Sequence, residues 1–163
     1  MNLPKILHLE TGVPQNRYGQ QEVLEHFLEI GDHGHRERAV RAIFDRAGVG
    51  SRYMVVEKGY FEQPRSTQER NDFYMREAVP LGEKVIAQGL AQAGLVATDI
   101  DDFTVVSCTG LSIPGLDLLL AARLGMRPDL QRTCILGMGC YGAFPGMRRG
   151  FESVKATSGR TAL

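Results

Sequence analysis

Cys140 is the residue of this chain whose type and surroundings most clearly favour chemistry. A short apolar run, residues 133–136, leads into a turn that contains Gly137, Gly139 and Gly142, and a segment compatible with a helix follows. This order predicts a strand, a tight turn and a helix, with the thiol at the start of the helix. Unpaired backbone N–H groups and the helix dipole favour a thiolate there, and a thiolate can accept and carry an acyl group. The alternative is that Cys140 packs as a small apolar residue.

A second stretch of interest lies between an expected strand at 103–108 and an expected helix at 114–124. This connection consists of Thr109, Gly110, Leu111, Ser112 and Ile113. In layered α/β folds, ligands usually bind at the carboxyl edge of the sheet, where such a connection lies. An ordinary surface loop is the alternative. The two other cysteines, Cys108 and Cys134, sit in or beside apolar runs, so we expect them to pack in the core.

The pattern of apolar residues predicts the elements that must position these groups. Helices are expected at 20–30, 39–48, from Ser66 or Thr67 onward with a break near Pro80, 114–124 and 140–157, and strands at 5–9, 52–56, 103–108 and 132–136. Alternating helices and short apolar strands favour an α/β fold with a largely parallel central sheet. Residues 160–163 look like the opening of a further strand, so we expect the chain to be a piece of a larger protein.

Composition narrows the functional classes. The chain has 163 residues with 43% hydrophobic and 23% charged residues, as expected for one globular domain with a core. Lys plus Arg and Asp plus Glu both total 19, so the overall charge does not favour nucleic acid or an anionic membrane as a partner. No secretory leader or membrane-spanning run is evident, and the three cysteines form no CxxC pair. We therefore expect a cytoplasmic protein with no nucleic-acid partner and no membrane span.

Metal and phosphate sites of the usual kinds are not indicated. His33 and His35 with Asp32 could suggest a metal cluster, but an HxH in a glycine loop without a further ligand is a weak signal. Gly137 and Gly139 do not begin a phosphate-binding loop, because no Gly-Lys-Ser/Thr follows them. We expect neither a metal ion nor another bound cofactor.

Three blocks of sequence together resemble a known family. They are residues 139–146 (GCYGAFPG), residues 108–117 (CTGLSIPGLD) and residues 124–128 (LGMRP), and weaker agreement extends back through residues 52–54 to the first expected strand. In these blocks the chain resembles the N-terminal half of a type III polyketide synthase, of the chalcone and stilbene synthase family. The wording of the first two blocks is most similar to bacterial alkylpyrone and alkylresorcinol synthases, which implies a long-chain fatty acyl-CoA starter.

The resemblance implies a thiolase-like fold, in which two similar βαβαβ-type halves pack into a five-layered body that pairs as a homodimer. Residues 1–163 would then be the N-terminal domain, incomplete at its C-terminus. It also implies that Cys140 takes a starter acyl group from an acyl-CoA, and that malonyl-CoA is then decarboxylated and condensed with it. Enzymes of this family use coenzyme A thioesters directly, without an acyl carrier protein or a metal ion.

The resemblance also assigns binding roles. The loop from Thr109 to Ile113 would line the acyl pocket, with Ile113 reaching across the dimer interface. Arg46 matches the position whose basic side chain contacts coenzyme A phosphates, and Arg38 and Arg41 lie on the same stretch. The catalytic His and Asn of the family lie in its C-terminal half, and none of the four histidines here sits in a matching motif.

Two other interpretations remain open. One is a β-ketoacyl synthase of fatty-acid synthesis, although that family usually places a small residue after the cysteine, where Tyr141 stands here. The other is a non-catalytic half-domain that binds acyl-CoA or dimerises, which the missing His and Asn favour.

Overall fold

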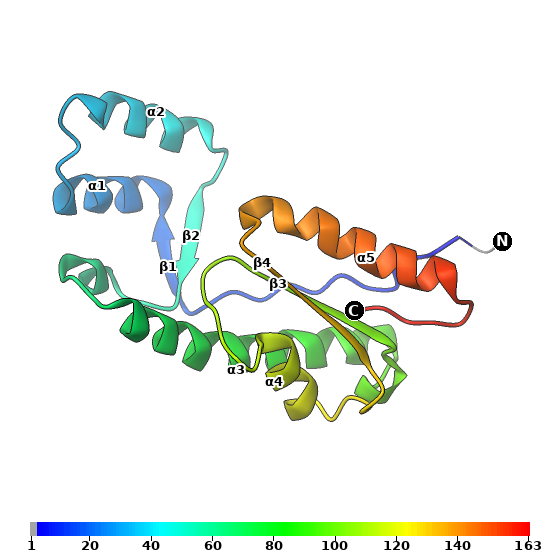
Figure 1. Cartoon of the computed structure of the whole chain (residues 1–163). Coiled ribbons are helices and arrows are strands. Elements are labelled where there is room, and N and C mark those ends of the chain that lie inside the picture. The colour runs from blue at the N-terminus through cyan, green and yellow to red at the C-terminus, as the bar shows by residue number, and fades with distance from the viewer. Residues whose placement is uncertain (1–2) are drawn as a thin grey trace. The chain divides into compact units, whose positions relative to one another are not determined.

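The computed structural model describes residues 3–163, which form two compact units (Figure 1). The first unit combines the residues up to Gly12 with Thr67–Leu163, and the second unit is Val13–Ser66. Each unit is described by itself below.

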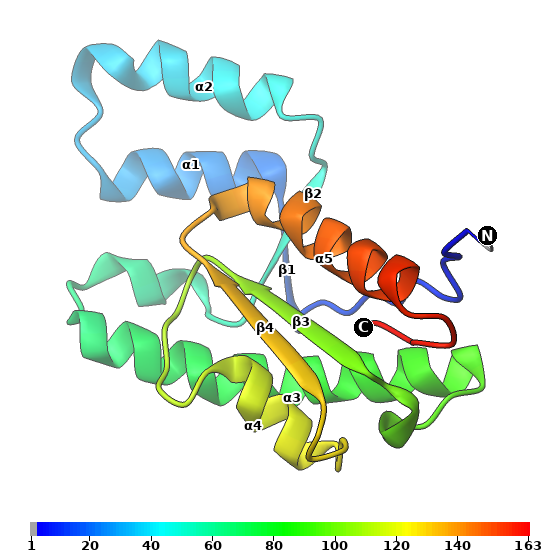
Figure 2. The ribbon, with the colours of Figure 1, turned by 45° about the vertical axis from the view of Figure 1, so that its right-hand side comes forward.

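The first unit has the layered α/β architecture that the sequence predicts. Its elements in chain order are α3 (Thr67–Ala93), a 3₁₀ turn η3 (Ala97–Asp99), β3 (Asp102–Ser107), α4 (Leu116–Arg123), β4 (Gln131–Leu136), a 3₁₀ turn η4 (Gly139–Gly142) and α5 (Ala143–Ala156). Strands β3 and β4 pair in parallel, which confirms the expected parallel sheet. Helices α3 and α4 lie on one face of the strand pair and α5 lies on the other (Figure 2).

Alternation along β3 explains these layers. Phe103 and Val105 point to the α3 and α4 side and are buried in the main core, which also contains Leu90, Ile100, Leu120 and Ala121. Burying a side chain such as Phe or Val contributes roughly 1.5–3 kcal/mol. Val106 points to the other face, because a Cβ placed on Gly146 of α5 would lie 2.9 Å from its Cγ2. Successive residues of a strand face opposite sides, so one strand holds both helical layers.

Helix α3 runs without interruption from Thr67 to Ala93, so the expected break at Pro80 is wrong. Proline within a helix removes one hydrogen bond and crowds the preceding turn, at a cost of about 3 kcal/mol. Here the residues beyond Pro80 are held by the core: Leu90 is buried and Ile86 packs against the same cluster. Tertiary packing therefore keeps the helix continuous despite the local preference.

The last residues pair with β3, as the sequence suggests. Thr161 O accepts a hydrogen bond from Asp101 N at 2.9 Å, Leu163 N donates to Asp102 O at 2.9 Å, and Ala162 forms a parallel bridge with Asp102. This side of β3 is therefore occupied by residues 161–163, and the other side by β4.

The segment 5–9 is not a strand, contrary to expectation. Contacts with α3 come from its residue His8 and from the residues just after the segment: a Cβ on Gly89 would lie 3.8 Å from His8 Cδ2 and 3.1 Å from Glu10 Cβ, and a Cβ on Gly12 would lie 2.2 Å from Val85 Cγ2. Both sides of β3 have other partners, and the apolar residues Ile6, Leu7 and Leu9 remain exposed, at 88%, 63% and 82%.

The second unit contains two antiparallel strands and two helices. These are β1 (Asn16–Gly19), α1 (Gln20–Ile30), a 3₁₀ turn η1 (Gly34–Arg36), α2 (Glu37–Arg46), β2 (Ser51–Met54) and a 3₁₀ turn η2 (Lys58–Glu62). Both helices and the β2 strand agree with the expected positions, whereas β1 is not indicated by the sequence pattern. Among the helices that the structure describes, none has the length and apolar character needed to cross a lipid bilayer.

Candidate active site

The parallel pairing of β3 and β4 brings two connections to the same edge of the sheet. Ser107 and Leu136 are register partners at the carboxyl ends of the two strands. The loop 108–113 leaves from the first and the turn that carries Cys140 leaves from the second, and Figure 2 shows both strands ending at the same edge. The two stretches that the sequence singled out therefore begin from neighbouring positions.

Cys140 lies in the 3₁₀ turn η4, and the α-helix proper begins three residues later, at Ala143. The expected helix start at Cys140 is therefore corrected to a tighter turn that continues into α5. The turn is reached through Gly137 and Gly139, whose φ angles of 75° and 55° lie in the left-handed region that favours glycine. The thiol of Cys140 is exposed. It lies in the turn that leads directly into the first turn of α5.

Helix α5 approaches β3 closely at its first turns. A Cβ on Gly142 would lie 2.6 Å from Val106 Cγ1, and one on Gly146 would lie 2.9 Å from Val106 Cγ2. Glycine at both positions allows the backbone of the helix to rest on the strand, and this contact fixes the height of the Cys140 turn above the sheet.

The loop 108–113 is held from the opposite face, by α3. Leu111 N donates a hydrogen bond to Asn71 Oδ1 at 2.8 Å, and Tyr74 Oη lies 2.5 Å from Ser107 Oγ. Thr109 is exposed, and the side chains of Leu111 and Ile113 are 58% and 95% exposed. Ser112 Oγ donates to the carbonyl of Pro114, and the Ile113–Pro114 peptide is cis.

Asn71 and Tyr74 were not identified from the sequence. Their hydrogen bonds join residues that are 33 and 40 positions apart in the sequence. Whether such residues meet depends on how α3 is rotated against the sheet, which local sequence patterns do not specify. Gly110 is a residue whose type reflects this contact, because a Cβ there would lie 2.0 Å from Tyr74 Cδ1.

Cys108 and Cys134 are exposed in the described chain, contrary to the expectation that they pack in the core. Cys108 follows the last residue of β3 and so belongs to the loop, while β4 has a strand partner on one side among the described residues. Partial burial raises the pKa of the Cys134 thiol, and the nearby Asp117 carboxylate adds to this effect. Asp117 itself is buried and accepts a hydrogen bond from Arg132.

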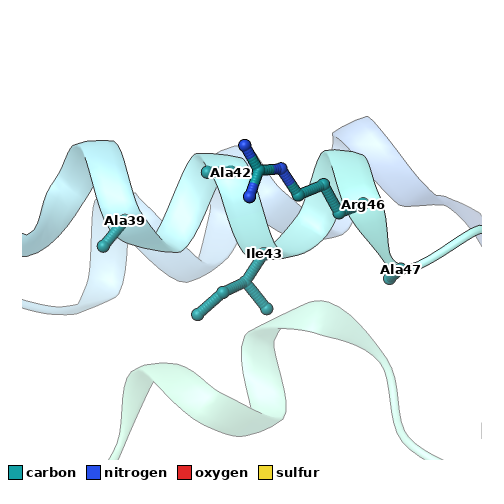
Figure 3. Close-up of a pocket in the computed structure, with 5 residues that line it drawn as sticks. All are labelled: Ala39, Ala42, Ile43, Arg46 and Ala47. Carbon is teal, nitrogen blue, oxygen red and sulfur yellow. The ribbon is translucent and has the colours of Figure 1, made fainter.

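Arg46 belongs to the second unit, where it is the last residue of α2. It lines a shallow surface depression with Ala39, Ala42, Ile43 and Ala47, and its guanidinium extends back along the helix toward Ala42 (Figure 3). Its neighbour Arg41 is engaged elsewhere, in ion pairs with Glu25 at 2.9 Å and Glu37 at 2.8 Å. Arg46 therefore offers a charge to solvent that Arg41 does not.

The histidine loop has a structural role. His33 Nε2 lies 2.9 Å from Phe27 O, and its ring stacks on Phe27 at a centroid distance of 4.6 Å. Within residues 3–163, no group of three or more His, Cys, Asp and Glu side chains is arranged to hold a metal ion.

Comparison with known proteins agrees with this architecture. Residues 2–160 match the family model for chalcone and stilbene synthases, N-terminal domain. The chain is 31% identical over 142 residues to a 1,3,6,8-tetrahydroxynaphthalene synthase of Streptomyces peucetius subsp. caesius, an alignment that covers 86% of this chain and 38% of that protein. It is 26% identical over 162 residues to the alpha-pyrone synthesis polyketide synthase-like Pks18 of Mycobacterium tuberculosis, covering 95% of this chain and 41% of the relative.

Solved structures show the same relationship. The chain superposes on the bacterial type III polyketide synthase 1,3,6,8-tetrahydroxynaphthalene synthase from Streptomyces coelicolor A3(2) with a TM-score of 0.85 and 28% identity, covering 94% of this chain and 44% of that one. The chain thus spans about two fifths of the length of these relatives, and its fold is the N-terminal half of the thiolase-like fold that they share. Because the domain model matches residues 2–160 and the parallel strand pair with its two connections agrees with the solved relative, the chain belongs to the chalcone and stilbene synthase family of type III polyketide synthases.

Proposed function

We propose that this chain is the N-terminal, nucleophile-bearing domain of a type III polyketide synthase, and that Cys140 is the residue that carries the acyl group. The observation that carries the proposal is the position of the Cys140 thiol. It is exposed, it lies at the start of a helical segment, and it emerges at the sheet edge from which the loop 108–113 also leaves.

In the proposed reaction the Cys140 thiolate attacks the carbonyl carbon of a starter acyl-CoA. A new carbon–sulfur bond forms at Sγ, the bond from the acyl carbon to the sulfur of coenzyme A breaks, and coenzyme A leaves as its thiolate, which takes up a proton from water. Loss of CO₂ from malonyl-CoA then gives a carbanion that attacks the acyl thioester, which releases the Cys140 thiolate for the next cycle. Splitting the condensation into these two steps avoids one more difficult step, and backbone N–H groups near the start of the helix can stabilise the oxyanion of each addition.

The remaining parts of the proposal concern binding. The loop from Thr109 to Ile113 forms one wall of the acyl pocket, and Ile113, which is 95% exposed here, reaches a second copy in a homodimer. Arg46 binds a phosphate of coenzyme A, for which the fork of an arginine is well suited. The starter is an acyl-CoA, and a long-chain fatty acyl group is the hypothesis that follows from the motif wording.

Residues 67–163 contain no histidine that could act as the general base for the Cys140 thiol, because all four histidines precede them in the sequence. Of these, His26 lies 3.0 Å from Lys58 O and His8 lies 3.2 Å from Glu10 Oε2. We therefore propose that full activity requires a C-terminal half that supplies a His and an Asn. The same observation favours the second candidate function, a half-domain that binds acyl-CoA or dimerises without catalysis.

Intact-protein mass spectrometry after brief exposure to dodecanoyl-CoA tests the proposal. The complete polypeptide encoded with this chain should gain one acyl group, which peptide mapping should place on Cys140. The adduct should disappear in Cys140→Ala. It should persist in the matched control Cys134→Ala, because the pKa of the wild-type Cys134 thiol is raised and this thiol is not expected to carry the acyl group. An adduct that survives in Cys140→Ala, or none in the wild type, would contradict the proposal. Extension that required an acyl carrier protein would indicate a β-ketoacyl synthase instead.

A further inference from the structure

Two polar side chains of α3 reach across to the loop that follows β3. Asn71 and Tyr74 are three residues apart in a continuous helix, so they lie on the same face, one turn from each other. Both are half-buried. Together they contact the start, the middle and the end of the backbone stretch from Ser107 to Leu111.

Tyr74 holds the first part of this stretch. Its hydroxyl lies 2.5 Å from Ser107 Oγ, and Ser107, which is 8% exposed, donates in turn to Gly110 O at 3.4 Å. The ring of Tyr74 lies directly against the backbone of Gly110, because a Cβ on that glycine would lie 2.0 Å from Cδ1 and 2.5 Å from Cε1. Any residue other than glycine at 110 would therefore displace either the ring or the loop.

Asn71 holds the second part. Its Oδ1 accepts a hydrogen bond from Leu111 N at 2.8 Å, across 40 positions of sequence. The side chains of Leu111 and Ile113 are 58% and 95% exposed, so apolar packing contributes little to the position of the loop. The contacts with α3 therefore hold the backbone from which the Leu111 side chain leaves.

We propose that Asn71 and Tyr74 are positioning residues that fix the loop 108–113 and thereby set which acyl groups the pocket accepts. The inference rests on the proposed function, because it takes this loop as a wall of the acyl pocket. The Leu111 side chain leaves from the Cα that is bonded to the amide nitrogen held by Asn71. Release of that amide lets the side chain move, which changes the room available to acyl chains of different length.

The test uses Asn71→Leu, which removes the acceptor at similar size, and Asn71→Asp, whose carboxylate still accepts from Leu111 N. Gln68→Leu is a matched control, since Gln68 is an exposed residue of the same helix. Tyr74→Phe removes the contact with Ser107 while keeping the ring against Gly110. Two quantities are measured in the complete polypeptide: hydrogen exchange of the Leu111 amide, and the ratio of the rates at which hexanoyl-CoA and dodecanoyl-CoA acylate Cys140.

Asn71→Leu should speed exchange at Leu111 about fivefold, which corresponds to the loss of one neutral hydrogen bond, and should change the ratio of acylation rates by a similar factor. Asn71→Asp should restore both quantities to near the wild-type values, and Gln68→Leu should leave both unchanged. Tyr74→Phe should change the ratio in the same direction as Asn71→Leu.

Three results would overturn the inference: unchanged exchange in Asn71→Leu, no rescue by Asn71→Asp, or faster exchange with an unchanged ratio. A wild-type protein that takes no acyl group on Cys140 would refute the proposed function itself, and the effect on acyl preference with it. In that case the exchange rates still show whether Asn71 anchors the loop, so the two failures are distinguishable.

Discussion

Gly142 is the position where a single added methyl group should disturb the Cys140 turn most directly. Its φ and ψ of −55° and −25° are ordinary for alanine, so backbone strain plays no part in the substitution. The difficulty is space: an alanine Cβ would lie 2.6 Å from Val106 Cγ1, whereas carbon atoms in contact prefer about 3.5–4.0 Å. The turn or the valine must therefore move by about 1 Å.

The expected magnitude follows from two opposing effects. Overpacking of this kind costs about 1–3 kcal/mol, and replacing glycine in helical backbone returns about 0.5–1 kcal/mol. Gly142→Ala should therefore lower the free energy of unfolding by about 1–2 kcal/mol and Tm by about 3–6 °C. Removing Cγ1 removes the clash, so in a Val106→Ala background Gly142→Ala should be neutral or slightly stabilising.

Thermal unfolding followed by circular dichroism, on the wild type, both single variants and the double variant, gives the coupling between the two sites. Gly50→Ala is the control, because a Cβ there meets nothing within 4 Å and its φ is not in the left-handed region. The rate of Cys140 alkylation by iodoacetamide should also change in Gly142→Ala and recover in the double variant. If Gly142→Ala costs the same in both backgrounds, the contact with Val106 does not hold the turn and the reasoning is wrong.

Three further predictions concern other groups of the first unit. Asp102 is fully buried, and neither of its carboxylate oxygens has a hydrogen-bond partner within residues 3–163. Asp102→Val should therefore raise the free energy of unfolding, measured by urea denaturation, by about 1–3 kcal/mol. A destabilised variant would contradict this. The pKa of Asp101 is lowered by the N–H of Thr161 and by Arg127, against desolvation. The Asp101 carboxylate therefore stabilises the fold above its unfolded-state pKa, and this contribution is lost as pH falls through its folded-state pKa. Asp101→Asn should cost about 1–2 kcal/mol of unfolding free energy at pH 7 and nearly nothing once the carboxylate of the wild type is protonated. Asp117→Asn should lower the pKa of Cys134 and speed its alkylation at pH 8 about threefold, since desolvation, the larger cause of the raised pKa, remains; an unchanged rate would mean that Asp117 does not act on the thiol.

Local signals in the sequence were enough to predict the elements around Cys140. The apolar run before Gly137 and the glycines of the turn indicated a strand and a helix start, and β4 and α5 lie where they were expected within a few residues. The tighter 3₁₀ geometry at Cys140 was missed, because a 3₁₀ turn and the first turn of an α-helix have the same residue preferences and differ in hydrogen bonding.

The errors occurred where contacts distant in sequence decide the structure. Pro80 breaks a helix by local rules, but residues beyond it are held by core contacts. Residues 5–9 have a strand-like pattern but form no strand, and Ile6, Leu7 and Leu9 are exposed. Cys108 follows an apolar run and Cys134 lies within one, yet both are exposed, because Cys108 belongs to a loop and Cys134 to a strand with one strand partner among the described residues. Whether such a segment pairs, packs or remains exposed depends on neighbours that its own sequence does not specify.

The two parts of the candidate site are positioned from opposite faces of β3. The Cys140 turn rests on the α5 face through Gly142 and Val106, whereas the loop 108–113 is held from the α3 face through Ser107, Tyr74 and Asn71. Val106 and Ser107 are neighbours in one strand and point to opposite sides, so a change on one face need not move the other. Substitutions at Asn71 should therefore alter the acyl preference while leaving the reactivity of the Cys140 thiol unchanged, and Gly142→Ala should do the reverse. Parallel shifts of both properties in either variant would mean that β3 moves as a whole and that the two faces are coupled.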